Sequence, residues 1–213
     1  MKVVNMGKTL VLLAGYPATG KSTFCAHLLK RHPGIPVVAP DDVKEELWDE
    51  VGFDTAAEKD RLELRVWEIY YARMEQHMRL GGPIVTDYPF SGKQRPTLSS
   101  LVERYGYHAI TVRFVGDIDR IYERSLKRDL SQARHLGHLM SHYHKGDYLA
   151  DRTKADALVT PRTLRDRCIG KGYGLFQMGD LIEVDATDIS AIDDQKVIDE
   201  IERLADADAC RKA

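Results

Sequence analysis

Short unbroken apolar runs alternate along the chain with longer stretches whose apolar residues have helical spacing. The short runs predict buried strands, because their hydrophobic residues are consecutive instead of alternating with polar ones. Five such runs occupy residues 9–15, 35–40, 83–87, 108–116 and 181–187. Strands that are apolar on both faces are typical of a parallel sheet that helices cover on each side.

The stretches between these runs predict helices. Within residues 57–80, an apolar side chain recurs at every fourth position from Leu62 to Met78, and the pattern ends at Gly81-Gly82. Similar spacing predicts helices over 94–105, 118–129 and 193–206, and Thr160-Pro161 predicts the start of another. Strand–helix alternation predicts an α/β fold, with a central parallel sheet of about five strands and helices on both faces. We expect residues 1–213 to form a single domain.

Residues 130–160 break this regular alternation. They are polar, rich in histidine and arginine, and only weakly periodic. A long irregular segment inside a compact domain is more often a functional lid than a domain boundary. We therefore expect an arginine-bearing lid over about residues 129–160.

Composition excludes some partners and leaves others open. The chain has 213 residues and a formal net charge of −2, so any basic binding surface must be local. Its cysteines, Cys25, Cys168 and Cys210, are odd in number and lack zinc or redox spacing, which predicts free thiols in a reducing compartment. No apolar run approaches the ~18 residues that span a bilayer. We expect a cytoplasmic protein without a membrane partner, and the sequence does not indicate an oligomeric state.

The sequence GYPATGKS, Gly15–Ser22, matches G-x-x-x-x-G-K-[S/T] and lies between an apolar run and a helical stretch. In such a loop, glycines let backbone N–H groups converge on phosphate oxygens at the positive end of a helix. We expect Lys21 to bridge the β- and γ-phosphates and Ser22 to bind Mg²⁺. ATP is favoured over GTP, because no Asn/Thr-Lys-x-Asp motif occurs. The expected nucleotide-binding residues are Gly15, Pro17, Ala18, Thr19, Gly20, Lys21, Ser22 and Thr23, the last of which can alternatively cap the helix.

Two carboxylates, Asp41 and Asp42, follow the second apolar run. Ligands of an open α/β sheet bind beyond the carboxyl ends of its strands, so Asp41 is a candidate to accept a proton from an attacking hydroxyl. The alternative is that Asp41 caps a helix. Asp42 with Glu45 resembles a capping box, and we assign capping to Asp42.

A third carboxylate, Asp87, ends the third apolar run. It is a candidate either to orient Mg²⁺ or to bind the acceptor. Lys93 and Arg95 follow in a loop that either faces the acceptor or is simply solvated. We include Arg95 among the candidate acceptor-binding residues.

A row of arginines recurs at steps of four, so Arg120, Arg124 and Arg128 share one helix face. We interpret Arg120 as part of a solvated face. We expect Arg124 and Arg128 to be catalytic and Arg134 to contact the nucleotide, because lid arginines neutralise charge that develops on a transferring phosphoryl group.

Four histidines lie in the same region: His135, His138, His142 and His144. The spacing of His138 and His142 suits a metal, but the residues between them lack the glutamate of H-E-x-x-H and no nearby cysteine completes a site. We favour contacts with phosphate, acceptor or each other over zinc. Plain surface histidines are the alternative.

Four features follow one another along the chain: G-x-P-x-x-G-K-S-T, D-x-x-[K/R], h-h-h-D and an arginine lid. This order resembles the P-loop kinase group that contains polynucleotide 5′-hydroxyl kinases, zeta-toxin-type kinases and antibiotic phosphotransferases. The resemblance covers about residues 8–135. It implies that Asp41 is the general base and that Asp87 helps to hold the acceptor. It also implies an acceptor contact for Lys44, where these families usually have arginine. Lysine cannot form the planar two-pronged bond of arginine, which argues against an acceptor with a 3′-phosphate.

The function predicted from these features is transfer of the γ-phosphoryl group of ATP to a hydroxyl of a small-molecule or nucleotide-type acceptor. One alternative is a nucleotide-binding regulatory module or switch with slow ATP hydrolysis. Another is a nucleic-acid 5′-hydroxyl kinase, which the net charge of −2 and the lack of an aromatic-studded basic groove do not favour.

Overall fold

The computed structural model describes residues 6–212, with side chains up to residue 208. In this region four parallel strands form one sheet in the order β2-β1-β3-β4. The strands are β1 (Thr9–Gly15), β2 (Ile84–Asp87), β3 (His108–Val115) and β4 (Asp180–Asp185). The predicted α/β class with a central parallel sheet is therefore confirmed, with four strands where about five were expected.

The missing strand is the run at residues 35–40. It makes a single parallel bridge between Val37 and Val85, in which Val38 N donates to Val85 O and Val85 N donates to Pro36 O. Pro36 has no N–H to donate, and Pro40 already begins the next helix. The prediction of a strand here was wrong, because prolines leave room for only one bridge beside β2.

The predicted helices are confirmed with small shifts of their ends, and α7 extends beyond residue 206. Thr160 caps α6 as expected, accepting a hydrogen bond from Thr163 N. The helices are α1 (Lys21–Arg31), α2 (Pro40–Val51), α3 (Ala56–Leu80), α4 (Arg95–Tyr105), α5 (Ile118–Asp129), α6 (Pro161–Gly170) and α7 (Asp194–Lys212). Short 3-10 turns add η1 (Leu136–His138), η2 (Arg152–Lys154), η3 (Tyr173–Leu175) and η4 (Ile189–Ala191).

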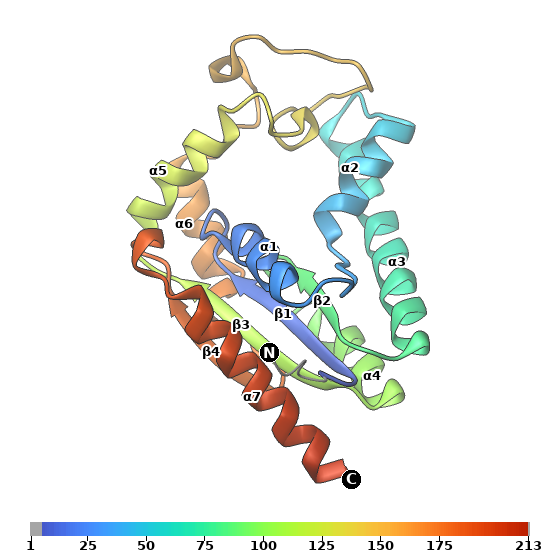
Figure 1. Cartoon of the computed structure of the whole chain (residues 1–213). Coiled ribbons are helices and arrows are strands. Elements are labelled where there is room, and N and C mark those ends of the chain that lie inside the picture. The colour runs from blue at the N-terminus through green and yellow to red at the C-terminus, as the bar shows by residue number, and fades with distance from the viewer. Residues whose placement is uncertain (1–5, 213) are drawn as a thin grey trace.

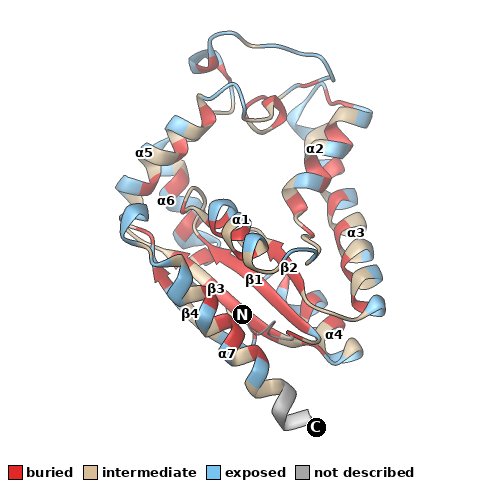
Figure 2. Cartoon of the chain, in the orientation of Figure 1, coloured by how far each residue is buried: buried red, intermediate tan, exposed pale blue. Residues whose placement is uncertain are grey.

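Helices cover both faces of the sheet (Figure 1). Along β1, Leu10 and Leu12 belong to the core that packs against α2, α3 and α4, whereas Val11 and Leu13 belong to the core formed with α1 and α7. This alternation follows from the two-residue period of a strand. Every residue of β1 is accordingly buried (Figure 2), which explains its unbroken apolar sequence, whereas the edge strand β4 exposes Asp180, Glu183 and Asp185.

The irregular segment expected as a lid is present. It runs from the end of α5 across to α2 at the top of Figure 1. Phe53 and Tyr143 exchange backbone hydrogen bonds of 2.8 and 2.7 Å, so the segment is fixed to the turn that follows α2. We call residues 130–160 the lid segment.

Other expectations concern the thiols and the membrane. Cys25 and Cys168 are free and buried, and the side chain of Cys210 lies outside those that the structure describes. Among the described residues, no helix combines the length and the apolar character that crossing a membrane requires.

Candidate functional site

Most of the predicted site residues meet in one cleft of about 770 Å³. Its walls are formed by the phosphate loop, by α2 and α3 on one side, and by α5 and α6 on the other. The predicted residues that line it are Pro17, Ala18, Thr19, Gly20, Lys21, Ser22, Thr23, Asp41, Lys44, Asp87, Arg128 and Arg134.

The loop between β1 and α1 has a backbone that only certain residues adopt. Gly15 has φ +103°, and a Cβ atom there would lie 2.0 Å from the carbonyl oxygen of Phe114. Ala18 has φ 56° although it is not glycine, which is a strained conformation of the kind that functional loops retain. Tyr16 N donates to Phe114 O at 2.8 Å and fixes the loop to β3.

Helix α1 begins at Lys21 with Gly20 as its N-cap, and no side chain caps it. Thr23 therefore lies inside the first turn, and capping by Thr23 is excluded. Because the first N–H groups of a helix lack intrahelical partners, an uncapped start that lines a cleft is suited to an anion.

Lys21 and Ser22 are held at the loop. Lys21 Nζ donates to Tyr16 O at 2.6 Å, and burial lowers the lysine pKa while Asp87 opposes that shift. Ser22 Oγ donates to Asp87 Oδ2 at 2.7 Å. Burial raises the pKa of Asp87, against the influence of Lys21 and Ser22. A hydroxyl and a carboxylate oxygen side by side are the oxygen ligands that Mg²⁺ prefers, so these residues fit the expected ion.

Helix α2 contributes Asp41 and Lys44. Lys44 Nζ lies 3.3 Å from Asp41 Oδ1 and 3.3 Å from Glu63 Oε1, and it donates to the Tyr88 hydroxyl at 3.1 Å. Burial alone would raise the pKa of Asp41, but Lys44, His138 and Arg134 outweigh burial and lower it. Burial also opposes a charge on Lys44, yet Asp41, Tyr88 and Glu63 raise its pKa. Both side chains are therefore ionised at neutral pH.

The N-cap of α2 is Ala39, so the assignment of Asp42 to capping was wrong. Pro40 occupies the start of the helix, where its fixed φ and missing N–H are favourable, and both aspartates fall within the first turn. There they complement the positive end of the helix dipole. Burial and the neighbouring carboxylates raise the pKa of Asp42.

One buried carboxylate anchors the two lid-side arginines. Asp129 is 4% exposed, and its Oδ1 accepts from Arg128 Nε at 2.9 Å. The same oxygen lies 3.8 Å from Arg134 Nε, while Arg134 Nη1 lies 3.9 Å from Glu45. Burial and the nearby charge of Arg128 lower the pKa of Arg134. Two guanidinium groups are thus gathered where they line the cleft.

Arg124 has a different environment from the one expected. Its Nε donates to Ala18 O at 3.2 Å, Nη1 donates to Thr187 O at 2.9 Å, and Nη2 donates to Ala186 O at 2.5 Å. It does not line the cleft. The structure corrects its placement: Arg124 ties the phosphate loop to the chain that follows β4.

Comparisons with known proteins agree with this geometry. The family model AAA_33, described as an AAA domain, matches residues 10–141. The chain belongs to this family. Comparison with curated proteins gives no match.

Solved structures with a similar fold include three that align over most of this AAA domain protein. A candidate kinase from Chloroflexus aurantiacus J-10-fl has a TM-score of 0.71 at 20% identity, covering 93% of this chain and 96% of that chain. The tunicamycin resistance protein of Deinococcus radiodurans has a TM-score of 0.55 at 16% identity, covering 91% and 93%. A gluconokinase from Sinorhizobium meliloti 1021 has a TM-score of 0.50 at 14% identity, covering 95% and 94%. The resemblance to P-loop kinases is therefore confirmed for the fold.

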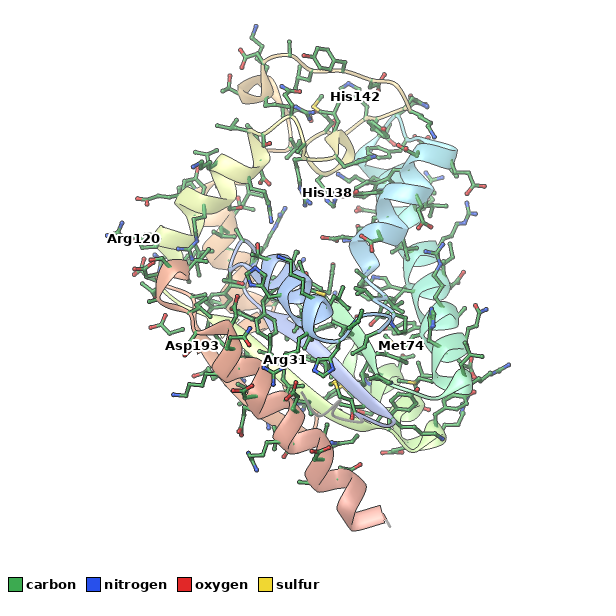
Figure 3. The ribbon with its side chains drawn as sticks, in the orientation of Figure 1. Arg31, Met74, Arg120, His138, His142 and Asp193 are labelled. Atoms are coloured by element: carbon green, nitrogen blue, oxygen red, sulfur yellow. The ribbon has the colours of Figure 1, made fainter. Side chains whose placement is uncertain are left out.

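Besides Arg124, two more arginines of this AAA domain protein lie away from the cleft. Arg95 donates to Gln177 O and lines a separate hollow with residues of α4 and β3. The structure thus does not bring Arg95 to the other acceptor candidates. Arg120 is exposed, lies 4.0 Å from Glu123, and points outward from α5 (Figure 3), as expected of a solvated face.

The histidines of the lid segment pair with carboxylates, which the sequence did not indicate. Those pairs include His135 Nε2 with Asp49 at 3.0 Å and His138 Nε2 with Glu45 at 2.7 Å, both on α2. His138 also lines the cleft and is directed toward the middle of the molecule in Figure 3. Among the described residues, no group of three or more His, Cys, Asp or Glu side chains is arranged to hold a metal ion.

Sequence reasoning also missed cleft residues on α3. Lys59 Nζ donates to Gly137 O at 2.6 Å and to Met140 O at 3.1 Å, and it lies 5.1 Å from the centre of the Trp48 ring. Burial lowers the pKa of Lys59 to about 8. The four-residue step between Lys59 and Glu63 puts both on one face, but helical spacing alone does not reveal that this face lines a cleft.

Proposed function

We propose that this protein transfers the γ-phosphoryl group of ATP to a hydroxyl of a small-molecule or nucleotide-type acceptor, with Mg²⁺ as its metal. The observation that carries the proposal is the shared cleft. An uncapped helix start with Lys21 and Ser22 lies opposite the Asp41–Lys44 pair, and Arg128 and Arg134 line the same space. A lysine-bound carboxylate in the same cleft as the phosphate loop serves acceptor chemistry better than simple holding of a nucleotide.

Each residue has a defined task in this proposal. Lys21 and the first N–H groups of α1 bind the phosphates, and Ser22 with Asp87 holds Mg²⁺. Mg²⁺ bound there would neutralise charge on the β- and γ-phosphates. Arg128 and Arg134 stabilise charge on the transferring group, while Arg124 supports the loop from behind.

Asp41 orients the acceptor hydroxyl and takes its proton. Its lowered pKa keeps the carboxylate charged at neutral pH, so it accepts the hydroxyl hydrogen bond without first losing a proton. Phosphoryl transfer passes through a loose transition state in most analyses, so positioning matters more than the strength of the base. Lys44 fixes the carboxylate in place from 3.3 Å.

The first test is label transfer from γ-labelled ATP with Mg²⁺, without acceptor and then with separate pools. The pools are nucleosides, 5′-hydroxyl oligonucleotides, sugars, and aminoglycoside or phenicol antibiotics. Transfer to one pool is the expected result and names the acceptor class. Tight nucleotide binding with slow hydrolysis and no transfer to any pool would instead support a nucleotide-dependent switch.

Substitution of Asp41 tests the assigned base. Asp41→Asn should reduce transfer by about a hundredfold or more, the usual contribution of a positioned proton acceptor, while the Kd for ATP stays within about twofold. Asp42→Asn is the matched control, because it changes the neighbouring aspartate of the same helical turn. Full transfer activity in Asp41→Asn would show that another group accepts the proton.

Substitution of Lys21 tests the phosphate loop. Lys21→Ala should weaken ATP binding and transfer together, because it removes a charge-assisted contact to the phosphates. Lys30→Ala on the exposed end of the same helix should change neither. Isothermal titration with ATP and the transfer assay measure the two effects. Unchanged ATP affinity in Lys21→Ala would contradict the assignment of the loop.

A further inference from the structure

Helix α6 and the turn after it carry cations in two different environments. On the outer side, Arg162 Nε lies 3.9 Å from Asp166 and Arg165 Nη2 lies 3.0 Å from Asp119. Arg167 and Lys171 line the cleft instead, and no ion pair joins either of them to a carboxylate within the described part of the chain. The two cations that face the cleft are therefore the ones left without a counter-charge.

Several carboxylates of the cleft are already engaged elsewhere. Asp41 and Glu63 both pair with Lys44, and Glu45 binds His138. Asp87 accepts the hydrogen bond of Ser22. If these carboxylates paired with Arg167 or Lys171, they would lose their present contacts with Lys44, His138 and Ser22.

Like charges surround Lys171. Partial burial lowers its pKa first, and Arg167 and Lys93 lower it further, against an opposing effect of Glu63. The charge of Arg167 also contributes to the lowered pKa of Lys59 on the opposite wall. Arg167 and Lys171 line the same cleft and repel each other, and a bound anion would relieve that repulsion.

The floor of the same region is aromatic and carries neutral hydroxyl groups. Tyr88 and Tyr173 line it, and the Tyr88 hydroxyl is bound by Lys44. Burial raises the pKa of Tyr173 to about 12, so its hydroxyl stays neutral. Such a surface suits the body of a polar small molecule, which leaves the cations to bind its charged end.

We propose that Arg167 and Lys171 bind an anionic group of the acceptor, a carboxylate or a phosphate, while the hydroxyl of the acceptor faces Asp41. This inference rests on the proposed function and specifies its substrate class. The planar fork of arginine matches two oxygens of either anion, and lysine adds a point charge. An acceptor held at both ends would present its hydroxyl in a fixed orientation.

A binding experiment tests the anion site independently of catalysis. The protein is saturated with Mg²⁺ and ADP so that the phosphate loop is occupied, and its Tm is measured with matched probes. The probes are glycerol, glycerate and glycerol 3-phosphate, and glucose, gluconate and glucose 6-phosphate, each up to millimolar concentration. At least one acid or phosphate should raise the Tm more than its neutral parent, and comparison of the two anions distinguishes carboxylate from phosphate.

Three variants locate the binding. Arg167→Ala and Lys171→Ala should each weaken the anionic probe about tenfold or more, the usual loss for one charge-assisted contact. Arg162→Ala, on the outer side of the same helix, should bind like the wild type. The inference is overturned if no anionic probe binds better than its neutral parent, or if Arg162→Ala loses as much affinity as Arg167→Ala.

Transfer from γ-labelled ATP to the same probes separates this inference from the proposed function. Transfer to an anionic probe, with KM raised about tenfold in Arg167→Ala and kcat little changed, is the expected result. Transfer only to neutral acceptors would overturn the inference and leave the kinase assignment in place. Anion binding that depends on Arg167, without transfer to any acceptor, would support the site and refute the kinase.

Discussion

Asp129 holds two arginines of the proposed catalytic site, although it ends a helix and does not itself line the cleft. Its buried carboxylate lies between the guanidinium groups of Arg128 and Arg134. Two like charges in one partly buried place repel each other, and the shared anion offsets that repulsion. Asp129 is in this sense a positioning residue for both arginines.

Removing that charge should therefore affect turnover more than binding. Asp129→Asn keeps the side-chain size but leaves two guanidinium groups without their common anion, so kcat should fall about tenfold or more with a smaller change in KM. The free energy of unfolding should also fall by about 1–3 kcal/mol, because a buried charge-assisted bond is lost. Asp119→Asn, on the exposed face of α5, is the control. Equal kcat values for Asp129→Asn and wild type would show that Arg128 and Arg134 need no anchor.

For single residues, the sequence predicts which side chains share a helix face, but not which of them reach the cleft. Arg124 and Arg128 share a helix face, yet they are separated by about 6 Å along the helix axis. That distance lets Arg128 reach the cleft, while Arg124 meets three backbone carbonyls behind the phosphate loop. The position of the phosphate loop between β1 and α1 could be predicted, because its motif is local. Arg167, Lys171 and Lys59 could not, since only the assembled walls of the cleft bring them there.

The helices and strands lie where the local sequence patterns predict them, except where prolines interrupt a pattern. Periodicity and caps predicted α3, α4, α5 and α6 because each signal lies within the helix it describes. The run at 35–40 has strand-like residues, but Pro36 and Pro40 limit it to one bridge and move the start of α2 ahead of Asp41. The docking of the lid segment onto α2 had no local signal. It depends on pairs such as His135 with Asp49, which are distant in sequence.

Lys59 on α3 gives the docked lid segment a measurable pH dependence. Its folded pKa is about 8, whereas the unfolded side chain retains its proton up to its ordinary value of 10.5. Between these values the unfolded state binds more protons, so the free energy of unfolding rises with pH. Relative to Lys59→Gln, the wild type should gain stability from about pH 8 to pH 10 and show no such gain below pH 8.

Denaturant unfolding at several pH values measures this difference. Lys154→Gln, which changes an exposed lysine of the lid segment, should show the same pH dependence as the wild type. A constant difference between wild type and Lys59→Gln across the whole range would mean that Lys59 titrates normally in the folded protein.

At the scale of the whole molecule, the walls of the cleft come from distant parts of the chain and are joined through the lid segment (Figure 1). Both flanks of its exposed tip are fixed. Before the tip, Tyr143 pairs with Phe53, and after it, Ala157 N donates to Leu139 O at 2.8 Å. Around Gly146 the contacts of the tip are exposed ones: Lys145 Nζ lies 3.7 Å from Asp49, and Gln132 Nε2 donates to Ala150 O at 3.0 Å.

Cutting the tip should therefore leave the molecule intact. A protease site inserted between Gly146 and Asp147, once cleaved, should give two fragments that co-elute, with a Tm lowered by only a few degrees and ATP binding retained. Pairing of β3 with β4 holds the fragments together, and the flanking contacts keep the lid segment docked. Gel filtration, melting and titration with ATP before and after cleavage provide the measurement. Loss of ATP binding on cleavage would show that the lid segment must be covalently continuous for the cleft to bind ATP.

The order of strands in the sheet also has a consequence for synthesis of the protein. The first strand made, β1, is an inner strand, and its neighbours β2 and β3 begin at residues 84 and 108. A growing chain emerges from the ribosome at about 5–20 residues per second, so the most apolar segment is exposed for several seconds before it can pair. Parallel pairing over such separations is slow even in the finished chain. We therefore expect β1, the strand that leads into the phosphate loop, to need protection from aggregation during translation, and its pairing on both sides to wait until β3 has left the ribosome.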